Sequence, residues 1–409
     1  MQEITVSRGN FERCLKCDTC TDVCPMKAVN PLYPGPKQAG PDEERYRLKN
    51  PEFYNYLLKY CLNCKRCEVA CPSGVKIGDL ILEAKLQYGK KSNPLRDFTL
   101  SNTDLVGTLS SPLAGIVNPV LGTGPVKAVL HGVMGVDRRR TFPSYSSRKF
   151  ASLFPKESQK GYRRYVSYFH GCYVNYNYPQ LGLDFVRLMN ACGYGVRLLD
   201  QEKCCGVALI SNGFKKQAVR QARVNVAELT KACDRGEPVL TTSSTCTFTM
   251  RDEYGHILSL DTSSYRDSLM LCTKWLFDKV DSGEIRLAFR KDFSLKAAYH
   301  TPCHMQKLGW QICSVSLLRR IPGLELTVLD QECCGIAGTF GFKKENYAFS
   351  QEIGAKLFAL IEKAGPEAVI TDCETCKWQI EMSTGLPVRN PVSILTEAID
   401  YEATRQLNL

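Results

Sequence analysis

Several features of common enzymes and of exported proteins are missing from this 409-residue chain. The N-terminal segment Met1 to Phe11 has no apolar stretch of the kind that forms a secretory signal. The sequence also has no Gly-rich phosphate loop of the Rossmann or P-loop type, and no nucleophile–base motif stands out. We therefore expect a chain of the reducing cytosol that does not itself bind flavin or nicotinamide, so that hydride chemistry belongs to another subunit.

A long, unbroken apolar run is also absent. The nearest approach is the segment from Leu105 to Val126, which carries no charged residue but contains Pro112, Pro119, Pro125 and four glycines. A membrane-spanning helix tolerates such breaks poorly. An integral anchor is not predicted, whereas a segment that lies on a membrane surface stays open.

Positive charge is plentiful, with a net charge of +11, but it is concentrated. Ten Lys or Arg lie between Lys127 and Arg164, against only Asp137 and Glu157. Such a cluster can bind nucleic acid or anionic lipid, or can simply be a solvated face. No nucleic-acid-binding motif accompanies it, so we expect no nucleic-acid partner.

Cysteine is the residue type in large excess, with 21 in the chain. Two copies of C-x2-C-x2-C-x3-C-P begin at Cys14 and at Cys61, a run typical of two-cluster bacterial ferredoxins, in which the fourth cysteine ligates the other cluster. The runs predict two [4Fe–4S] cubanes, the first held by Cys14, Cys17, Cys20 and Cys71, and the second by Cys61, Cys64, Cys67 and Cys24. Zinc would leave the third cysteine and the proline of each run unexplained, and disulfides would need an oxidising compartment.

The remaining chain is an internal duplication with a period of about 130 residues. Three landmarks recur in order: YVSYFHGC (165–172) with AAYHTPC (297–303), LLDQEKCCGVA (198–208) with VLDQECCGIA (328–337), and VLTTSSTC (239–246) with VITDCETC (369–376). Each places cysteines directly after a short β-branched or aromatic run that predicts a buried strand. Helical patterns lie between the landmarks, at 178–191, 214–231, 305–320 and 344–363, and further helices are expected at 47–60 and 76–88.

Alternation of strands and helices predicts parallel sheets, whose ligand crevice lies beyond the carboxyl ends of the strands. We therefore predict an α+β multidomain chain. Its parts are a helical ferredoxin-like domain with two [4Fe–4S] clusters (1–95), a basic and apolar linker that could lie on a membrane (96–165), and two duplicated α/β Cys-Cys-Gly domains with parallel sheets (166–285 and 286–409).

The cysteines of each repeat should converge on one site. Repeat two offers Cys303, Cys333, Cys334, Cys373 and Cys376, and repeat one offers Cys172, Cys204, Cys205 and Cys246. Where a fifth cysteine is expected, repeat one has Ser243, whose hydroxyl is a poor iron ligand. The pair Cys373 and Cys376 alone would also fit a thioredoxin-type redox pair or a zinc half-site.

Three histidines flank these cysteines: His170, His300 and His304. A hydrogen-bonded structural histidine is the simpler interpretation. The alternative is a histidine that tunes a cluster by a hydrogen bond or carries a proton beside it. Four further cysteines, at positions 192, 233, 272 and 313, fit no pattern and are expected to be ordinary buried thiols.

Two CxxCxxCxxxCP runs followed by two Cys-Cys-Gly repeats resemble the heterodisulfide-reductase-like family of iron–sulfur subunits. The similarity extends from about residue 11 to the C-terminus and is greatest to the iron–sulfur subunits of anaerobic glycerol-3-phosphate dehydrogenases. Specific strings carry it: residues 30–49 (NPLYPGPKQAGPDEERYRLK), 60–79 (YCLNCKRCEVACPSGVKIGD), 242–248 (TSSTCTF), 341–347 (GFKKENY) and 371–384 (TDCETCKWQIEMST).

The resemblance implies an electron-transfer subunit without flavin. Such a subunit would take electrons from a flavin dehydrogenase subunit that oxidises glycerol 3-phosphate, would work with a further subunit, and would pass electrons to menaquinone. It would lie peripherally on the anionic surface of the inner membrane, on its cytoplasmic face. The five cysteines of repeat two resemble a non-cubane [4Fe–4S] site, whereas Ser243 leaves a fourth cluster, in repeat one, open.

Other functions stay open at this point. The chain could be a catalytic subunit that reduces a disulfide at a repeat-two cluster, as in heterodisulfide reductases. It could also be the iron–sulfur subunit of a glycolate or lactate oxidase, or a freely soluble ferredoxin-type carrier.

Overall fold

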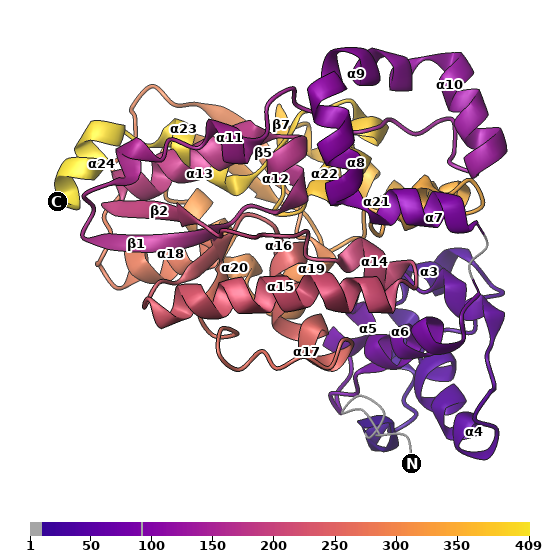
Figure 1. Cartoon of the computed structure of the whole chain (residues 1–409). Helices are drawn as coiled ribbons and strands as arrows, with labels where there is room; N and C mark the ends of the chain where they lie inside the picture. Colours follow the sequence, from indigo (N-terminus) through magenta and orange to yellow (C-terminus); the bar gives the residue numbers. More distant parts are fainter. Residues whose placement is uncertain (1–9, 91–92) are drawn as a thin grey trace.

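The computed structural model describes residues 10–90 and 93–409. Most of the N-terminal segment considered for a signal sequence therefore lies outside the described residues. The described chain is α+β, as predicted, and its duplicated halves lie together on the left of Figure 1, with the ferredoxin-like domain below right.

Each repeat contains one sheet of four parallel strands with the same order. In repeat one the order is β2-β1-β3-β4, and in repeat two it is β6-β5-β7-β8. The first sheet comprises β1 Arg164–Phe169, β2 Tyr194–Leu198, β3 Val239–Thr241 and β4 Leu269–Leu271. The second comprises β5 Leu295–Tyr299, β6 Leu324–Val328, β7 Ala368–Ile370 and β8 Val388–Arg389. The predicted parallel sheets are thus confirmed, and β4 and β8 are additional short edge strands that the cysteine landmarks did not reveal.

Helices connect the strands of both repeats. Those of repeat one are α12 Gly171–Tyr176, α13 Pro179–Ala191, α14 Val207–Ser211, α15 Lys215–Asp234, α16 Ser244–Phe248, η7 Thr249–Glu253, α17 Tyr254–His256 and α18 Cys272–Asp281. Those of repeat two are α19 Cys303–Leu308, α20 Gln311–Leu318, η8 Phe340–Phe342, α21 Tyr347–Ala364, α22 Glu374–Thr384, α23 Pro391–Ala398 and α24 Tyr401–Leu407.

The single helix predicted for 305–320 is wrong. Gly309, with φ of +74°, ends α19 in the left-handed conformation, and α20 begins afresh two residues later. A glycine adopts this conformation without steric strain, so it terminates helices readily.

The ferredoxin-like domain is built of short helices around two Cys-rich loops. They are η1 Phe11–Arg13, α2 Thr19–Asp22, α3 Pro25–Val29, η2 Gln38–Asp42, α4 Glu43–Lys49, η3 Tyr56–Tyr60, α5 Arg66–Val69 and α6 Ile77–Tyr88. The helix predicted for 47–60 is wrong, because α4 ends at Lys49 and only a 3-10 turn follows at Tyr56. Pro51 explains the break, since it disfavours helical backbone at the preceding Asn50.

The linker is helical, which corrects the prediction that prolines and glycines break it. It contains α7 Pro94–Ser101, α8 Thr103–Ser110, η4 Ser111–Leu113, α9 Ala114–Gly122, α10 Gly124–Val129, η5 Leu130–Met134, α11 Phe150–Leu153 and η6 Glu157–Gln159. Together α8, η4 and α9 form a 20-residue helix, Thr103–Gly122, with a mean hydropathy of 1.3 and only 17% of its apolar window buried. Pro112 lies in the first turn of η4, where its missing N–H does little harm. By length and composition, this helix could cross a membrane.

Charged side chains join the ferredoxin-like domain to both repeats. The ammonium of Lys65 is fully buried, 2.5 Å from Asp79 in its own domain and 3.9 Å from Glu253 in repeat one. Glu68 forms a second link, with its carboxylate 2.8 Å from Lys307 in repeat two. Buried ion pairs are favourable only when all partners stay in place, so these contacts fix how the domains meet.

The middle of the linker is fixed by Arg140, whose side chain is fully buried against repeat two. Its guanidinium donates to the backbone oxygen of Gly341 at 2.6 Å and to Ser350 at 3.0 Å, and it also bonds to Gln379. Arg138, only two residues earlier, is exposed. Arg138 therefore serves as an exposed control for the buried Arg140.

We predict that Arg140→Ala lowers the free energy of unfolding by about 3 kcal/mol, because it leaves buried acceptors unpaired. Arg138→Ala should change it by less than about 0.5 kcal/mol. Urea unfolding of the cluster-loaded chain, followed by circular dichroism, measures both. Equal effects of the two substitutions would show that the linker is not held through Arg140.

Candidate metal centres

The two ferredoxin-type loops share an unusual backbone. Lys16 and Asp18, on either side of Cys17, have φ of 58° and 66°. Asn63 and Lys65, on either side of Cys64, have φ of 55° and 63°. Non-glycine residues rarely adopt this left-handed conformation, and it persists only where the surroundings enforce it. The loops are therefore curled in the same way around two separate centres.

Seven of the eight thiols have neighbours that match the crossed sets that the spacing predicts. Burial raises the pKa of Cys20 to about 11, and Cys14 and Cys71 are among the neighbouring charges that add to this shift. Burial likewise raises the pKa of Cys24 to about 12, with Cys64 and Cys61 as its charged neighbours. Cys24 thus lies with the second run rather than with its own.

The two remaining cysteines of the runs, Cys67 and Cys17, have different surroundings. Cys67 is buried beside Cys64, Cys61 and Cys24. Cys17 is exposed, with its Sγ 3.4 Å from the hydroxyl of Thr19. The first set is therefore the more accessible from solvent.

Repeat two brings its five predicted thiols together at the carboxyl ends of β5, β6 and β7. The Sγ atoms of Cys303 and Cys333 are 3.9 Å apart, and those of Cys334 and Cys376 are 3.3 Å apart. Cys373 joins them through a hydrogen bond with Cys376, which is the main cause that lowers the pKa of Cys373 to about 5. All five are free thiols, and the set fits iron as a thiophilic metal.

The glycine of the Cys-Cys-Gly motif has a steric role. Gly335 has φ of +85°, and a Cβ built there would lie 1.9 Å from the backbone oxygen of Ser350. Its N–H points to the Sγ of Cys333 at 3.4 Å. The motif therefore needs glycine so that the backbone can turn closely around the thiols.

Repeat one brings its four predicted thiols together in the same way. Cys172 and Cys204 are 3.7 Å apart at their Sγ atoms, and Cys205 hydrogen-bonds to Cys246. Ser243 instead caps α16, because its hydroxyl accepts the N–H of Cys246 at 3.2 Å. A side chain held as a helix cap is not free to bind a metal, so the two sites differ in their donor sets.

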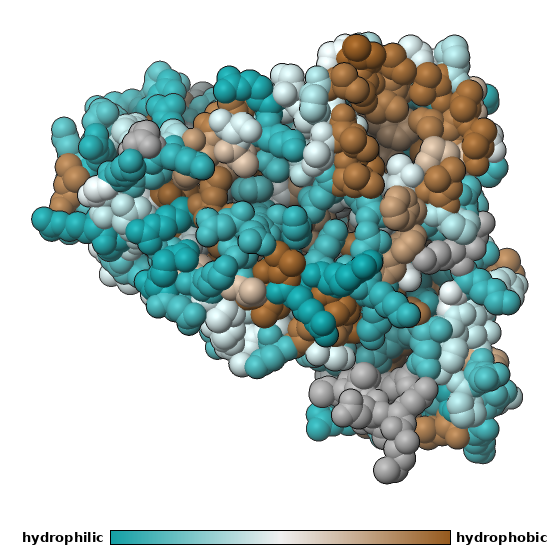
Figure 2. All heavy atoms as spheres, viewed as in Figure 1, coloured by the Kyte–Doolittle hydropathy of each residue, from teal (hydrophilic) through white to brown (hydrophobic). Residues whose placement is uncertain are grey.

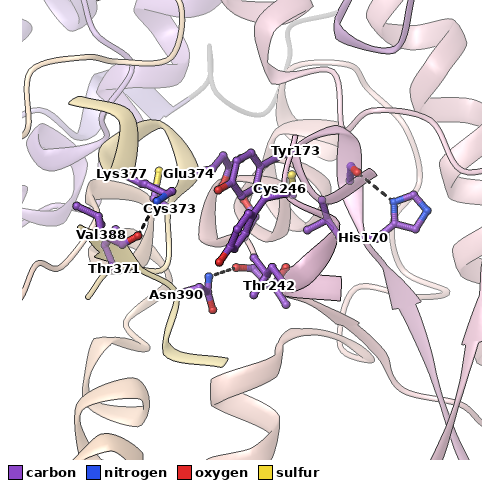
Figure 3. Close-up of a pocket in the computed structure, with 15 residues that line it drawn as sticks. His170, Tyr173, Thr242, Cys246, Thr371, Cys373, Glu374, Lys377, Val388 and Asn390 are labelled. Atoms are coloured by element: carbon purple, nitrogen blue, oxygen red, sulfur yellow. Dashed lines mark hydrogen bonds between the residues drawn. The ribbon is translucent and has the colours of Figure 1, made fainter. Parts of the chain in front are cut away.

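A small pocket separates the two sites where the repeats face each other. Figure 3 shows Cys246 of repeat one and Cys373 of repeat two on opposite sides of it, with Glu374 nearby. Asn390 donates to the backbone oxygen of Thr242 at 2.9 Å and links the repeats across this pocket. The two sites therefore share one interface rather than lying at remote ends.

A larger cavity of about 340 Å³ is lined by all nine repeat cysteines named above and by Cys64 of the second cubane set. The Cys64 thiol hydrogen-bonds to Cys303 and lies close to Cys333. The second cubane set and the repeat-two set are consequently in direct contact.

The three histidines have different surroundings. The Nδ1 atom of His170 is 3.0 Å from the backbone oxygen of Gly171 and 3.1 Å from Glu202. His304 bridges to the ferredoxin-like domain, with Nε2 3.2 Å from the backbone oxygen of Asn63. His300 is fully buried, and its nitrogen lies with the sulfurs of Cys334 and Cys376 in a group whose atoms are all within 4.8 Å of one another. Burial lowers the pKa of His300 to about 4, so its ring is neutral.

Sequence reasoning missed several residues at repeat one. The carboxylate of Asp104, at the start of α8, accepts the N–H of Cys204 at 2.8 Å, and Thr103 lies close to the thiol of Cys204. Glu374 of repeat two bonds to Ser243, and burial raises its pKa to about 8. No local motif marks the linker residues, whereas Glu374 lies inside the Cys373–Cys376 motif and could have been noticed there.

The four patternless cysteines lie apart from these sets. Cys192 and Cys272 belong to the main hydrophobic core, and Cys313 is also buried. Cys233 is half-buried on α15. Substitutions of these four cysteines can therefore serve as controls for substitutions of the site cysteines.

Two family models match the chain in the regions that carry these thiols. A 4Fe–4S dicluster domain matches residues 10–75. A cysteine-rich domain of the CCG type matches twice, at residues 166–251 and 297–381. Iron–sulfur clusters are therefore the cofactors that both the donor sets and the family models support.

Relatives match over nearly the whole chain. The glycolate oxidase iron–sulfur subunit of Escherichia coli is 25% identical and covers 95% of this chain and 94% of its own. A fumarate reductase (CoM/CoB) subunit of Methanothermobacter marburgensis is 23% identical over 90% of this chain and 67% of its own. An anaerobic glycerol-3-phosphate dehydrogenase subunit of Escherichia coli is 54% identical over 95% of this chain and 99% of its own. With its cysteine sets and this degree of identity, the chain belongs to the family of iron–sulfur subunits of anaerobic glycerol-3-phosphate dehydrogenase.

Proposed function

We propose that this chain carries electrons from a flavin-bearing dehydrogenase partner to menaquinone, on the cytoplasmic face of the inner membrane. The observation that carries the proposal is the contact of Cys64 with Cys303 and Cys333, which joins the second cubane set to the repeat-two set. Iron–sulfur clusters bound to these thiols supply one-electron transfer. The chain's own residues determine the order in which the sites are reached.

The order follows from accessibility. Cys17 of the first set is exposed, so this end suits a partner that delivers electrons. The second set lies against repeat two, where His304 contacts Asn63 beside Cys64 and Lys307 pairs with Glu68 beside Cys67. Electrons would therefore enter at the first set, pass to the second, and leave through repeat two.

The helical linker supports a membrane location. Large apolar side chains are exposed along α8, η4, α9, α10 and η5, and Figure 2 shows apolar residues gathered over α8, α9 and α10 at the upper right. They are Leu105, Leu109, Leu113, Ile116, Val120, Val129 and Val133. We call this set the apolar linker face. A contiguous exposed apolar surface of this kind is typical of protein or membrane contacts.

Apolar burial, rather than charge, should dominate membrane binding. Full burial of one such side chain contributes about 1.5–3 kcal/mol, so even partial insertion of the apolar linker face gives on the order of 10 kcal/mol. A Lys or Arg near anionic lipid contributes about 1 kcal/mol. The basic cluster is also smaller than the sequence suggests, because Arg140 is buried and Arg139 is paired with Asp137. We therefore expect a peripheral protein that salt alone releases poorly.

The linker also supports a route for quinone. Leu121, Leu130 and Met134 line the same cavity as the repeat cysteines, and they lie beside the apolar linker face in the chain. An apolar ring that enters from the membrane would thus meet apolar side chains before it reaches the thiols.

We predict that the chain purified without oxygen holds about twelve irons, because two cubanes contain about eight and one further four-iron cluster adds four. In EPR spectra of the fully reduced protein, the second cubane should show magnetic coupling to the repeat-two cluster. Cys333→Ser should remove this coupling and the repeat-two signal.

Cys233→Ser is the matched control, since Cys233 is half-buried and outside both sets. It should leave the iron content and the coupling unchanged. An iron content of about eight, with uncoupled cubane spectra, would contradict an exit through repeat two.

We predict that the double substitution Leu109→Glu and Ile116→Glu releases the protein from vesicles that contain anionic phospholipid and lowers binding at least tenfold. These residues are 64% and 66% exposed, so the fold should tolerate the change. The control is Leu32→Glu with Leu48→Glu, which are 68% and 67% exposed in the ferredoxin-like domain. Vesicle flotation measures all three proteins, and equal loss of binding in both double variants would contradict docking through the linker.

We predict that vesicles containing menaquinone oxidise the reduced, bound protein faster than vesicles without it. Stopped-flow absorbance of the clusters measures the rate. Equal rates with and without menaquinone would show that the acceptor is a different molecule.

A further inference from the structure

His300 is a buried polar side chain without a hydrogen-bond partner, as is the hydroxyl of Thr371 at the end of the adjacent strand. It is fully buried, and neither ring nitrogen has a hydrogen-bond partner among the described residues. An unpaired polar group in a protein interior is destabilising, and a ligand, an ion or an ordered water is a common explanation for one. The nearby histidines are paired, since His170 contacts Gly171 and His304 contacts Asn63.

The ring faces the repeat-two thiols. A nitrogen of His300 and the sulfurs of Cys334 and Cys376 all lie within 4.8 Å of one another, and Cys333 is also close enough to influence the ring. Ligand atoms around one tetrahedral ion lie about 3.5 Å apart for bonds of about 2.0–2.3 Å. The observed group can therefore close around a metal with small side-chain movements.

The backbone holds His300 at a defined place. Its N–H donates to the backbone oxygen of Ile370 at 2.9 Å, which continues the pairing of β5 with β7 by one residue. In repeat one, the same register places Phe169 beside Thr241 at the end of β1. The position that carries an imidazole in repeat two thus carries a phenyl ring in repeat one.

We propose that His300 binds iron directly, as a sixth protein ligand of the repeat-two cluster beside its five cysteines. The inference rests on the proposed presence of a cluster in repeat two. The proposal gives the repeat-two cluster a nitrogen ligand from the protein. Repeat one has no such ligand, because Phe169 stands in place of the histidine and Ser243 in place of the fifth cysteine. The two repeats would then hold sites of different composition despite their common fold.

The test is pulsed EPR of the full-length, cluster-loaded protein in which only histidine carries ¹⁵N. The repeat-two signal should show a hyperfine coupling of the size expected for a directly bound nitrogen, and labelling should convert its ¹⁴N pattern to that of ¹⁵N. His300→Phe, which copies repeat one, should abolish the coupling. His304→Phe and His170→Phe are the controls and should retain it.

Two further variants separate ligation from hydrogen bonding. His300→Cys supplies another iron ligand and should preserve the midpoint potential better than His300→Gln, which can donate a hydrogen bond but binds iron poorly. If Gln preserves the potential as well as Cys does, or if the wild-type nitrogen coupling is only that of a hydrogen bond, the ring is not a ligand. Wild-type labelling decides this even if a variant fails to assemble.

The outcomes also separate this inference from the proposed function. A repeat-two cluster without a bound histidine nitrogen overturns the role of His300 alone. An iron content of about eight, or one zinc ion held in repeat two in place of a cluster, overturns both.

Discussion

The close approach of thiols from distant parts of the chain is the constraint on which the rest of the structure depends. In repeat two, sulfur atoms lie 3.3 to 3.9 Å apart, although as thiolates they would repel one another. Parallel strands solve this problem, because the carboxyl ends of β5, β6 and β7 meet at one edge of the sheet. The left-handed residues around Cys17 and Cys64 solve it in the ferredoxin-like domain by curling the loops. Iron bound to these sets would remove the repulsion that burial of the thiols creates.

A second constraint is the alignment of the two kinds of site. A ferredoxin-like domain on a flexible tether would place its clusters at variable distances from the repeats. Here the buried Lys65 pairs with Asp79 and Glu253, and Glu68 pairs with Lys307, so both repeats hold the second Cys-rich loop. Cys64, which contacts Cys303, lies in this loop next to Lys65 and three residues before Cys67. Loss of one member would leave the others buried without a counter-charge, which favours a single arrangement of the domains.

The linker joins the metal centres to the surface. Its helix Thr103–Gly122 exposes apolar residues on one side, while its first turn contacts repeat one through the hydrogen bond of Asp104 with Cys204. Gly107 allows close approach to the ring of Tyr176, since a Cβ there would lie 2.4 Å from it. The same segment therefore has an exposed apolar face and a direct hydrogen bond to a cysteine of a candidate metal centre. In Figure 1 this segment projects at the upper right, away from the two sheets.

Local patterns were enough to predict the ferredoxin-like runs, the duplication and the parallel sheets. They also predicted which cysteines gather in each repeat, because the spacing of cysteines and the ends of strands depend on residues that are neighbours in the sequence. The same patterns gave wrong predictions for 47–60, 305–320 and the linker, where Pro51, Gly309 and Pro112 act according to their exact place in a turn. The burial of Arg140, the capping of a helix by Ser243 and the position of His300 beside thiols became visible only in the folded chain. Those outcomes depend on which distant residues pack against each side chain, and neither composition nor periodicity encodes that packing.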